Sequence, residues 1–319
     1  MLFLNLLRRD KPDVVPAGHR RQTMIKAAID VGTNSVRLLV AKTIEGTWHT
    51  LVKEVETTRL GEGVHASRKL KPAAMQRTIA AVDSFAAKAK QLGAEQVLAV
   101  ATSAVRDAVN GLEFVRLCQE QTGITLEILD GEAEARLSYA GAVTDWSEAG
   151  QCMVIDIGGG STEVIVGIGN YLTSAQSFNI GAVRLSELFP ADEQGKVNCL
   201  PQLREYIARQ LNFPTGFKGI LIGVGGTITS LAAIDQGLRE YSRELVHGYK
   251  LSAAQIDRWL QHLAAMPLVE RRQIAGLQPQ RADIIVYGTA ILSVCLQRLA
   301  APHITVSEKD ILEGVLLFR

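Results

Sequence analysis

The stretch VIDIGGGSTEVIV, residues 154–166, decides the fold because a close counterpart precedes it in the chain. AIDVGTNSVRLLV, residues 28–40, aligns with it without a gap at an offset of 126 residues. Each copy joins two β-branched apolar runs through a short Gly, Ser and Asn turn, which is typical of a β-hairpin. The matched polar and turn pairs are Asp30 with Asp156, Gly32 with Gly158 and Ser35 with Ser161. The chain therefore contains a duplicated hairpin with an acid at the end of its first strand.

The paired acids distinguish this duplication from two unrelated hairpins, whose turns would also favour glycine and asparagine. A carboxylate costs several kcal/mol to bury unless it is paired or bound to a metal ion. We therefore expect Asp30 and Asp156 to lie beside cations. Glycines let the backbone approach a ligand closely and point N–H groups at phosphate oxygens. The hairpins thus predict two similar α/β domains that face one another across a phosphate-binding cleft, with Mg²⁺ as a suitable bridging ion.

Length and composition indicate a globular protein of two domains. The chain has 319 residues, of which 47% are hydrophobic, enough for two ordinary cores. Its 34 basic and 33 acidic residues leave no overall field that would recruit a nucleic-acid polymer or a membrane surface. No apolar stretch reaches the roughly 18 residues of a membrane helix. Four widely spaced cysteines without a zinc-ligand pattern are typical of a cytoplasmic protein with reduced thiols.

Three further segments place polar residues where a strand gives way to a helix, the position at which ligands gather in open α/β sheets. QVLAVAT leads into SAVRD, where Ser103 and Arg106 also fit a helix cap and a surface charge. LEILD leads into GEAEARL, whose Glu132 and Glu134 lie in a first helical turn, where the helix dipole also favours acids. GILIGVGGT predicts another backbone-lined anion site, formed by Gly225, Gly226 and Thr227.

Several other catalytic motifs are absent from the sequence. It contains no Walker A motif, no GxGxxG that opens a helix after a strand, no HExxH and no GxSxG. The functional signal therefore comes from several glycine turns within one duplicated framework.

Eight blocks in order resemble the exopolyphosphatase and guanosine pentaphosphate phosphohydrolase family over about residues 25–319. The blocks are IDVGTNSVRLLV, TSAVRDAVN, GEAEARLSYAG, VIDIGGGSTEVIVG, GVGGTITSLAAI, VHGYKLS, RADIIVYGTAIL and VSEKDILEGVL. The resemblance implies two ribonuclease H-like domains of the actin, sugar kinase and Hsp70 superfold, facing an interdomain cleft. The first domain would span residues 24–131 with about 307–319, the second 132–306, and residues 1–23 would form a flexible extension.

The resemblance also implies roles for individual residues. Glu134 would be the base that deprotonates the attacking water, and Arg106 would bind phosphate beside it. Asp156 and Glu163 match the family's acidic metal positions, with Asp30 a further contributor through water. We expect Mg²⁺, with Mn²⁺ as an alternative and a monovalent cation such as K⁺ as a further candidate. The candidate phosphate-binding residues are Gly32, Thr33, Asn34, Ser35, Ser103, Gly158, Gly159, Gly160, Ser161, Thr162, Gly225, Gly226 and Thr227.

The expected activity is release of the terminal phosphate of inorganic polyphosphate by attack of water. The alternative substrate is guanosine pentaphosphate (pppGpp), which would lose its 5′ γ-phosphate, and one protein could act on both. Sugar kinases of the same superfold transfer phosphate to a hydroxyl, but GEAEARL resembles the phosphatase block. A sensor that binds a phosphorylated ligand without turnover is a third hypothesis, which Glu134 disfavours. The helical C-terminal extension of longer family members is not part of this sequence, and a homodimer is implied only by analogy.

Overall fold

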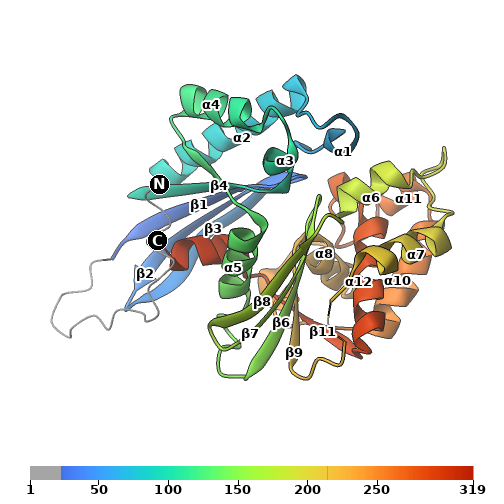
Figure 1. Cartoon of the computed structure of the whole chain (residues 1–319). Coiled ribbons are helices and arrows are strands. Elements are labelled where there is room, and N and C mark those ends of the chain that lie inside the picture. The colour runs from blue at the N-terminus through green and yellow to red at the C-terminus, as the bar shows by residue number, and fades with distance from the viewer. Residues whose placement is uncertain (1–22, 214, 319) are drawn as a thin grey trace.

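The computed structural model describes residues 23–213 and 215–318. The predicted extension, residues 1–23, lies outside this range apart from Thr23. Two β-sheets with their helices form two lobes (Figure 1). A cavity lies between the lobes. This architecture confirms the predicted α/β fold class. None of the helices in the described ranges is long and apolar enough to cross a membrane.

The first lobe is built on a five-stranded sheet in the order β3-β2-β1-β4-β5. β1, β2 and β3 form two antiparallel hairpins, whereas β4 and β5 run parallel to β1. The strands are β1 (Ile25–Val31), β2 (Ser35–Ile44), β3 (Thr47–Thr57), β4 (Gln96–Ala101) and β5 (Leu126–Ile128). The helices are α1 (Val64–Ser67), α2 (Pro72–Gln91), α3 (Ser103–Asp107) and α4 (Gly111–Thr122).

The second lobe repeats this plan on a six-stranded sheet in the order β10-β11-β9-β6-β7-β8. β6, β7 and β8 are antiparallel hairpin strands, and β9 and β11 run parallel to β6. The strands are β6 (Gln151–Ile157), β7 (Thr162–Ile168), β8 (Tyr171–Phe178), β9 (Ile220–Val224), β10 (Lys250–Ser252) and β11 (His303–Val306). The helices are α6 (Ala182–Leu188), α7 (Leu200–Gln210), α8 (Gly226–Asp235), α9 (Arg243–Val246), α10 (Ala253–Ala265), α11 (Leu268–Arg271) and α12 (Ile285–Leu299), with a 3-10 turn at Pro279–Arg281. The shared plan confirms the predicted pair of ribonuclease H-like lobes.

Helix α5 (Gly131–Ala142) lies between the two sheets and contacts both of them (Figure 1). Its Ala133 and Leu137 pack with the first sheet and with α13 (Ile311–Leu317). Its Ala135 and Tyr139 pack on the second sheet. Gly141 permits the close contact with α13, because a Cβ there would lie 1.8 Å from the Asp310 carbonyl oxygen. One helix therefore fixes the two sheets relative to each other.

The alternation of side chains along a strand directs both acids of the repeat toward α5. Ala27, Ile29 and Val31 of β1 pack in the core that contains α2 and α4, so Asp30 points to the opposite face. In β6, Ile155 and Ile157 pack in the core that contains α8, α10 and α12, so Asp156 also points to the α5 face. The duplicated hairpins therefore place their carboxylates on the two sheet faces that meet across the cleft.

Candidate functional site

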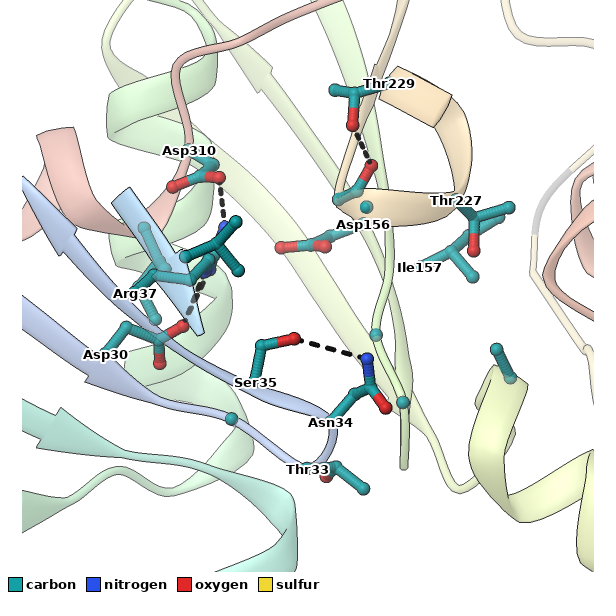
Figure 2. A pocket seen from close by; sticks show the side chains of 18 of the residues that line it. Asp30, Thr33, Asn34, Ser35, Arg37, Asp156, Ile157, Thr227, Thr229 and Asp310 are labelled. Atoms are coloured by element: carbon teal, nitrogen blue, oxygen red, sulfur yellow. Dashed lines mark hydrogen bonds and ion pairs between the residues drawn. The ribbon is translucent and has the colours of Figure 1, made fainter. Parts of the chain in front are cut away.

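A cavity of about 330 Å³ lies between the lobes and is lined by residues from both. Figure 2 shows Asp30, Asn34 and Ser35 of the first hairpin across from Asp156 and Ile157 of the second. Most of the residues singled out in the sequence line this one cavity: Asp30, Gly32, Thr33, Asn34, Ser35, Ser103, Glu134, Asp156, Gly158, Gly159, Ser161, Glu163, Gly225, Gly226 and Thr227. Segments far apart in the sequence thus converge on a single candidate site.

Three of the residues singled out do not line the cavity. Thr162 is fully buried and donates its hydroxyl to the Ile180 carbonyl oxygen at 2.7 Å, because it is the first residue of β7 and alternates away from Ser161. Gly160 lies behind the cavity, against Thr33 and Ser103. Arg106 reaches the site indirectly, through its contact with Glu134.

Glu134 projects into the cleft from the first turn of α5 and is buried. The helix is capped by Asp130, whose Oδ1 accepts the Ala133 N–H at 2.8 Å, so neither glutamate of the turn serves as the cap. Arg106 Nη1 donates to Glu134 Oε2 at 2.7 Å and to the Leu129 carbonyl oxygen at 2.9 Å. Burial raises the pKa of Glu134 to about 7, against the lowering effect of the Arg106 charge. A carboxylate with this pKa and a fixed orientation has the properties of a general base at neutral pH.

The second hairpin brings two further carboxylates into the same region. Asp156 and Glu163 lie opposite each other in the β6–β7 register. Burial raises the pKa of Asp156 to about 6, and Ser138 Oγ donates to its Oδ2 at 2.8 Å. Burial and the nearby charge of Glu134 hold the pKa of Glu163 well above its ordinary value, and Ser177 Oγ donates to its Oε1 at 2.7 Å. The three acids therefore repel one another and favour a cation between them.

The first hairpin differs at the equivalent position, where Arg37 lies opposite Asp30. Arg37 donates to Asp30 Oδ2 from Nε at 2.9 Å and from Nη2 at 2.7 Å, and it also contacts Asp310 (Figure 2). The cation expected beside Asp30 is thus an arginine of the chain itself. Asp30 Oδ1 remains buried without a hydrogen-bond partner.

The glycine turn of the second hairpin is held from behind by α6. The backbone N–H groups of Ala182 and Val183 donate to the carbonyl oxygens of Gly158 and Gly159 at 3.0 and 2.9 Å. In a trans peptide the C=O of one residue and the N–H of the next point in opposite directions. The N–H groups of Gly159 and Gly160 therefore point away from α6. This geometry suits the binding of an anion by the backbone.

A second glycine turn, between β9 and α8, faces the same cavity. Gly225 has a φ of 92°, a left-handed conformation that favours glycine. Arg281 lies directly against Gly226, since a Cβ at Gly226 would come within 1.9 Å of Arg281 Nη1. Burial and the charge of Arg37 lower the pKa of Arg281 to about 10. Arg281 forms no ion pair with any residue that the structure describes, so its charge remains available to an anion.

The two hairpin turns touch each other at the base of the cleft. Thr33 and Ser103 share a hydrogen bond of 2.8 Å between their hydroxyl groups. A Cβ at Gly160 would lie 2.6 Å from Ser103 Oγ and 2.9 Å from Thr33 Oγ1, so only glycine permits this approach. The first and second lobes are thus in direct contact behind the cavity.

The carboxylates fit a metal ion that needs few protein ligands. Within residues 23–213 and 215–318, no three His, Cys, Asp or Glu side chains are placed to hold an ion by themselves. The unpartnered Asp30 Oδ1 and the raised pKa values of Asp156 and Glu163 nonetheless mark a site short of positive charge. Mg²⁺ commonly uses one or two carboxylates together with substrate phosphates and water. The donor set suits this mode of binding.

Sequence reasoning missed several charged residues that line the cavity. They include Arg37, Lys53, Arg281, Glu308 and Asp310. The repeat itself contained a signal for Arg37, because Arg37 aligns with Glu163 at the same offset as Asp30 with Asp156. Lys53 lies within β3, and Arg281, Glu308 and Asp310 lie at the ends of elements or between them, so none of these four belongs to the duplicated stretches.

The fold consists of two α/β lobes around a cleft that is lined by glycine turns and carboxylates. These features define the class of the protein, which is two-lobed and has a candidate site for a phosphorylated ligand. Residues 39–318 match the Ppx/GppA phosphatase family. The chain belongs to this family, and it is a phosphatase-family protein.

Individual relatives agree with the family assignment. Exopolyphosphatase 2 of Mycobacterium tuberculosis strain H37Rv is 33% identical over 310 residues, which are 91% of this chain and 97% of the relative. A bifunctional 3-dehydroquinate synthase/phosphatase of Fusobacterium nucleatum subsp. nucleatum is 29% identical and covers 93% of this chain, which spans 47% of that relative.

Solved structures resemble the fold over nearly its whole length. The Ppx/GppA family member of Aquifex aeolicus has a TM-score of 0.78 and 30% identity, covering 93% of this chain and 97% of the other. An exopolyphosphatase from Cytophaga hutchinsonii has a TM-score of 0.83 and 30% identity, with the same coverage of 93% and 97%.

Proposed function

We propose that the chain is a Mg²⁺-dependent exopolyphosphatase that removes the terminal phosphate of inorganic polyphosphate by attack of water. The observation that carries this proposal is the placement of Glu134. Its carboxylate is buried, has a pKa of about 7 and faces a cavity lined by two glycine turns. A protein that only binds a polyanion has no need of a buried carboxylate that faces it.

The proposed reaction assigns one task to each group. Glu134 Oε accepts a proton from water and orients it toward the terminal phosphorus. The N–H groups of Gly159, Gly160 and Ser161 stabilise the charge on the transferring phosphoryl oxygens, and Arg106 holds the Glu134 carboxylate in place. Mg²⁺, held by Asp156 or Glu163, would neutralise charge on the phosphate oxygens. Mn²⁺ is the alternative ion, and a monovalent cation such as K⁺ is a further candidate.

Guanosine pentaphosphate is the second candidate substrate, because an aromatic side chain, Tyr241, lines the cavity together with Arg243 and Lys53. Tyr241 is 44% exposed, and its ring provides a surface on which a base can stack. The same catalytic groups would then act on the γ-phosphate of the nucleotide.

Phosphate release measured side by side on the two substrates tests the proposal. We expect Mg²⁺-dependent release of inorganic phosphate from polyphosphate, with chelation by EDTA abolishing it. Faster release from guanosine pentaphosphate at equal concentration would favour the second substrate. Binding of either compound without phosphate release would contradict hydrolysis and favour the sensor.

A further inference from the structure

A cluster of charged residues from both lobes lies behind the candidate site, on the far side of the two hairpin turns. It surrounds a small second cavity lined by residues of α1, α3 and α6. The site described above makes no use of this cluster. Its centre is Arg184, in the first turn of α6.

Arg184 completes the hydrogen bonds that hold the glycine turn. Backbone N–H groups of α6 donate to the carbonyl oxygens of Gly158 and Gly159. Arg184 Nε donates to the carbonyl oxygen of Gly160 at 2.9 Å. Because the C=O of Gly160 and the N–H of Ser161 point in opposite directions in a trans peptide, this contact also directs the Ser161 N–H away from α6. The Arg184 side chain thus fixes the last peptide of the turn.

The same guanidinium group crosses to the first lobe. Arg184 Nη2 donates to Asp107 Oδ2 at 2.7 Å, and Nη1 lies 2.8 Å from His65 Nδ1. The Arg184 and Asp107 side chains are only 13% and 21% exposed, so solvent screens this ion pair weakly. One turn further along α6, Glu187 Oε1 accepts the Gly63 N–H at 2.7 Å, which adds a second link between the lobes.

The contact reaches the proposed base through a short path. Asp107 directly follows Arg106 in α3, and Arg106 holds Glu134. Ser103, at the start of α3, bonds Thr33 of the first hairpin turn. Arg184 therefore joins the glycine turn of one lobe to the helix that orients the base from the other.

We propose that Arg184 is a positioning residue, which couples the contact between the two lobes to the geometry of the phosphate-binding turn. The proposal rests on the proposed phosphohydrolase function for its kinetic consequences. The ion pair to Asp107 holds Arg184 in place, and Arg184 holds the Gly160 carbonyl so that the turn presents its N–H groups to the substrate. Arg184 does not touch the substrate.

Arg184→Ala, Arg184→Lys, Asp107→Asn and the Arg184→Ala/Asp107→Asn double variant test this role. The control is Arg209→Ala, which removes an exposed ion pair to Glu205 on α7. Initial rates of phosphate release from polyphosphate with Mg²⁺ give kcat and KM. Hydrogen–deuterium exchange of the peptide that contains residues 158–161 reports the turn without any need for activity.

We expect Arg184→Ala to lower kcat/KM by about 10- to 100-fold, mostly in kcat, and to speed exchange at residues 158–161. Asp107→Asn should lower kcat/KM by less, because the contact of Arg184 with Gly160 is kept. The kcat/KM of the double variant should match that of Arg184→Ala within about twofold. Arg184→Lys keeps the charge but not the three contacts and should fall between Arg184→Ala and the wild type. If Arg184→Ala fails to fold, Arg184→Lys tests the proposal in its place.

Two results would overturn the proposal. One is an Arg184→Ala protein with kcat/KM within twofold of the wild type and unchanged exchange at residues 158–161. The other is a double variant whose losses are the product of the two single losses, since independent effects exclude a shared contact. Failure of the wild type to release phosphate would instead contradict the proposed function, and the exchange measurement would still decide the role of Arg184.

Discussion

Replacing Arg106 by glutamine should move the pH profile of the enzyme toward higher pH. Arg106 Nη1 lies 2.7 Å from Glu134 Oε2, and its charge opposes the burial that raises the pKa of Glu134 to about 7. An opposite charge this close commonly lowers the pKa of a carboxyl by about 1–3 units, so its removal should raise the pKa by a similar amount. Glutamine preserves a hydrogen-bond donor while removing the charge.

The magnitude follows from the fraction of Glu134 that is ionised. A general base must be deprotonated, so kcat/KM of the wild type should fall as the pH drops through about 7. If the pKa of Glu134 rises by about two units, the ionised fraction at pH 7 falls about 50-fold. Most of this loss should be regained near pH 10. A loss that is equal at every pH would instead come from weaker phosphate binding.

The assay is kcat/KM for phosphate release from polyphosphate between pH 5.5 and 10, which reports the free enzyme. Titration of the substrate itself affects wild type and variant alike. Arg116→Gln is the matched control, because Arg116 forms an exposed ion pair with Glu120 on α4, away from the cleft. If kcat/KM falls on the acid side of the profile at the same pH in Arg106→Gln and in the wild type, the coupling between Arg106 and Glu134 is refuted.

Two further predictions concern stability. Folding raises the pKa of Glu134 to about 7 and of Asp156 to about 6, so the metal-free protein should lose stability as the pH rises from about 4 through 7. In thermal melts, Mg²⁺ should raise Tm by roughly 3 °C at pH 8 and little at pH 5. Equal shifts of Tm at the two pH values would contradict a carboxylate site. Gly141→Ala puts a Cβ 1.8 Å from the Asp310 carbonyl oxygen and should lower the free energy of unfolding by about 1–3 kcal/mol in urea titration, whereas an unchanged urea midpoint would contradict the close packing of α5 on α13.

The sequence predicted the fold because the duplicated hairpin determines both topology and orientation. The offset between AIDVGTNSVRLLV and VIDIGGGSTEVIV implied two similar lobes, and strand alternation then placed Asp30 and Asp156 on facing surfaces. Local patterns also predicted individual elements. The strand-to-helix junctions expected at QVLAVAT–SAVRD and at GILIGVGGT lie where β4 gives way to α3 and β9 to α8.

The sequence could not predict contacts that depend on how the lobes meet. Arg184 and Arg281 acquire their roles only through contacts in the folded chain, of Arg184 with the Gly160 carbonyl oxygen and of Arg281 with Gly226. Likewise Arg37 pairs with Asp310, which is 273 residues away in the chain. The sequence also predicts Thr162 as a phosphate-binding residue beside Ser161, which is wrong because alternation directs adjacent strand residues to opposite faces.

The most direct test of the central claim compares two glutamates of the same helical turn. Glu134 is buried in the cleft, whereas Glu132 is exposed and paired with Arg136 at 2.7 Å. Phosphate release from polyphosphate should fall at least about 100-fold in Glu134→Gln and stay near the wild-type rate in Glu132→Gln. Near-normal turnover in Glu134→Gln, or equal losses in both variants, would contradict the claim that a buried carboxylate of α5 activates water between the lobes.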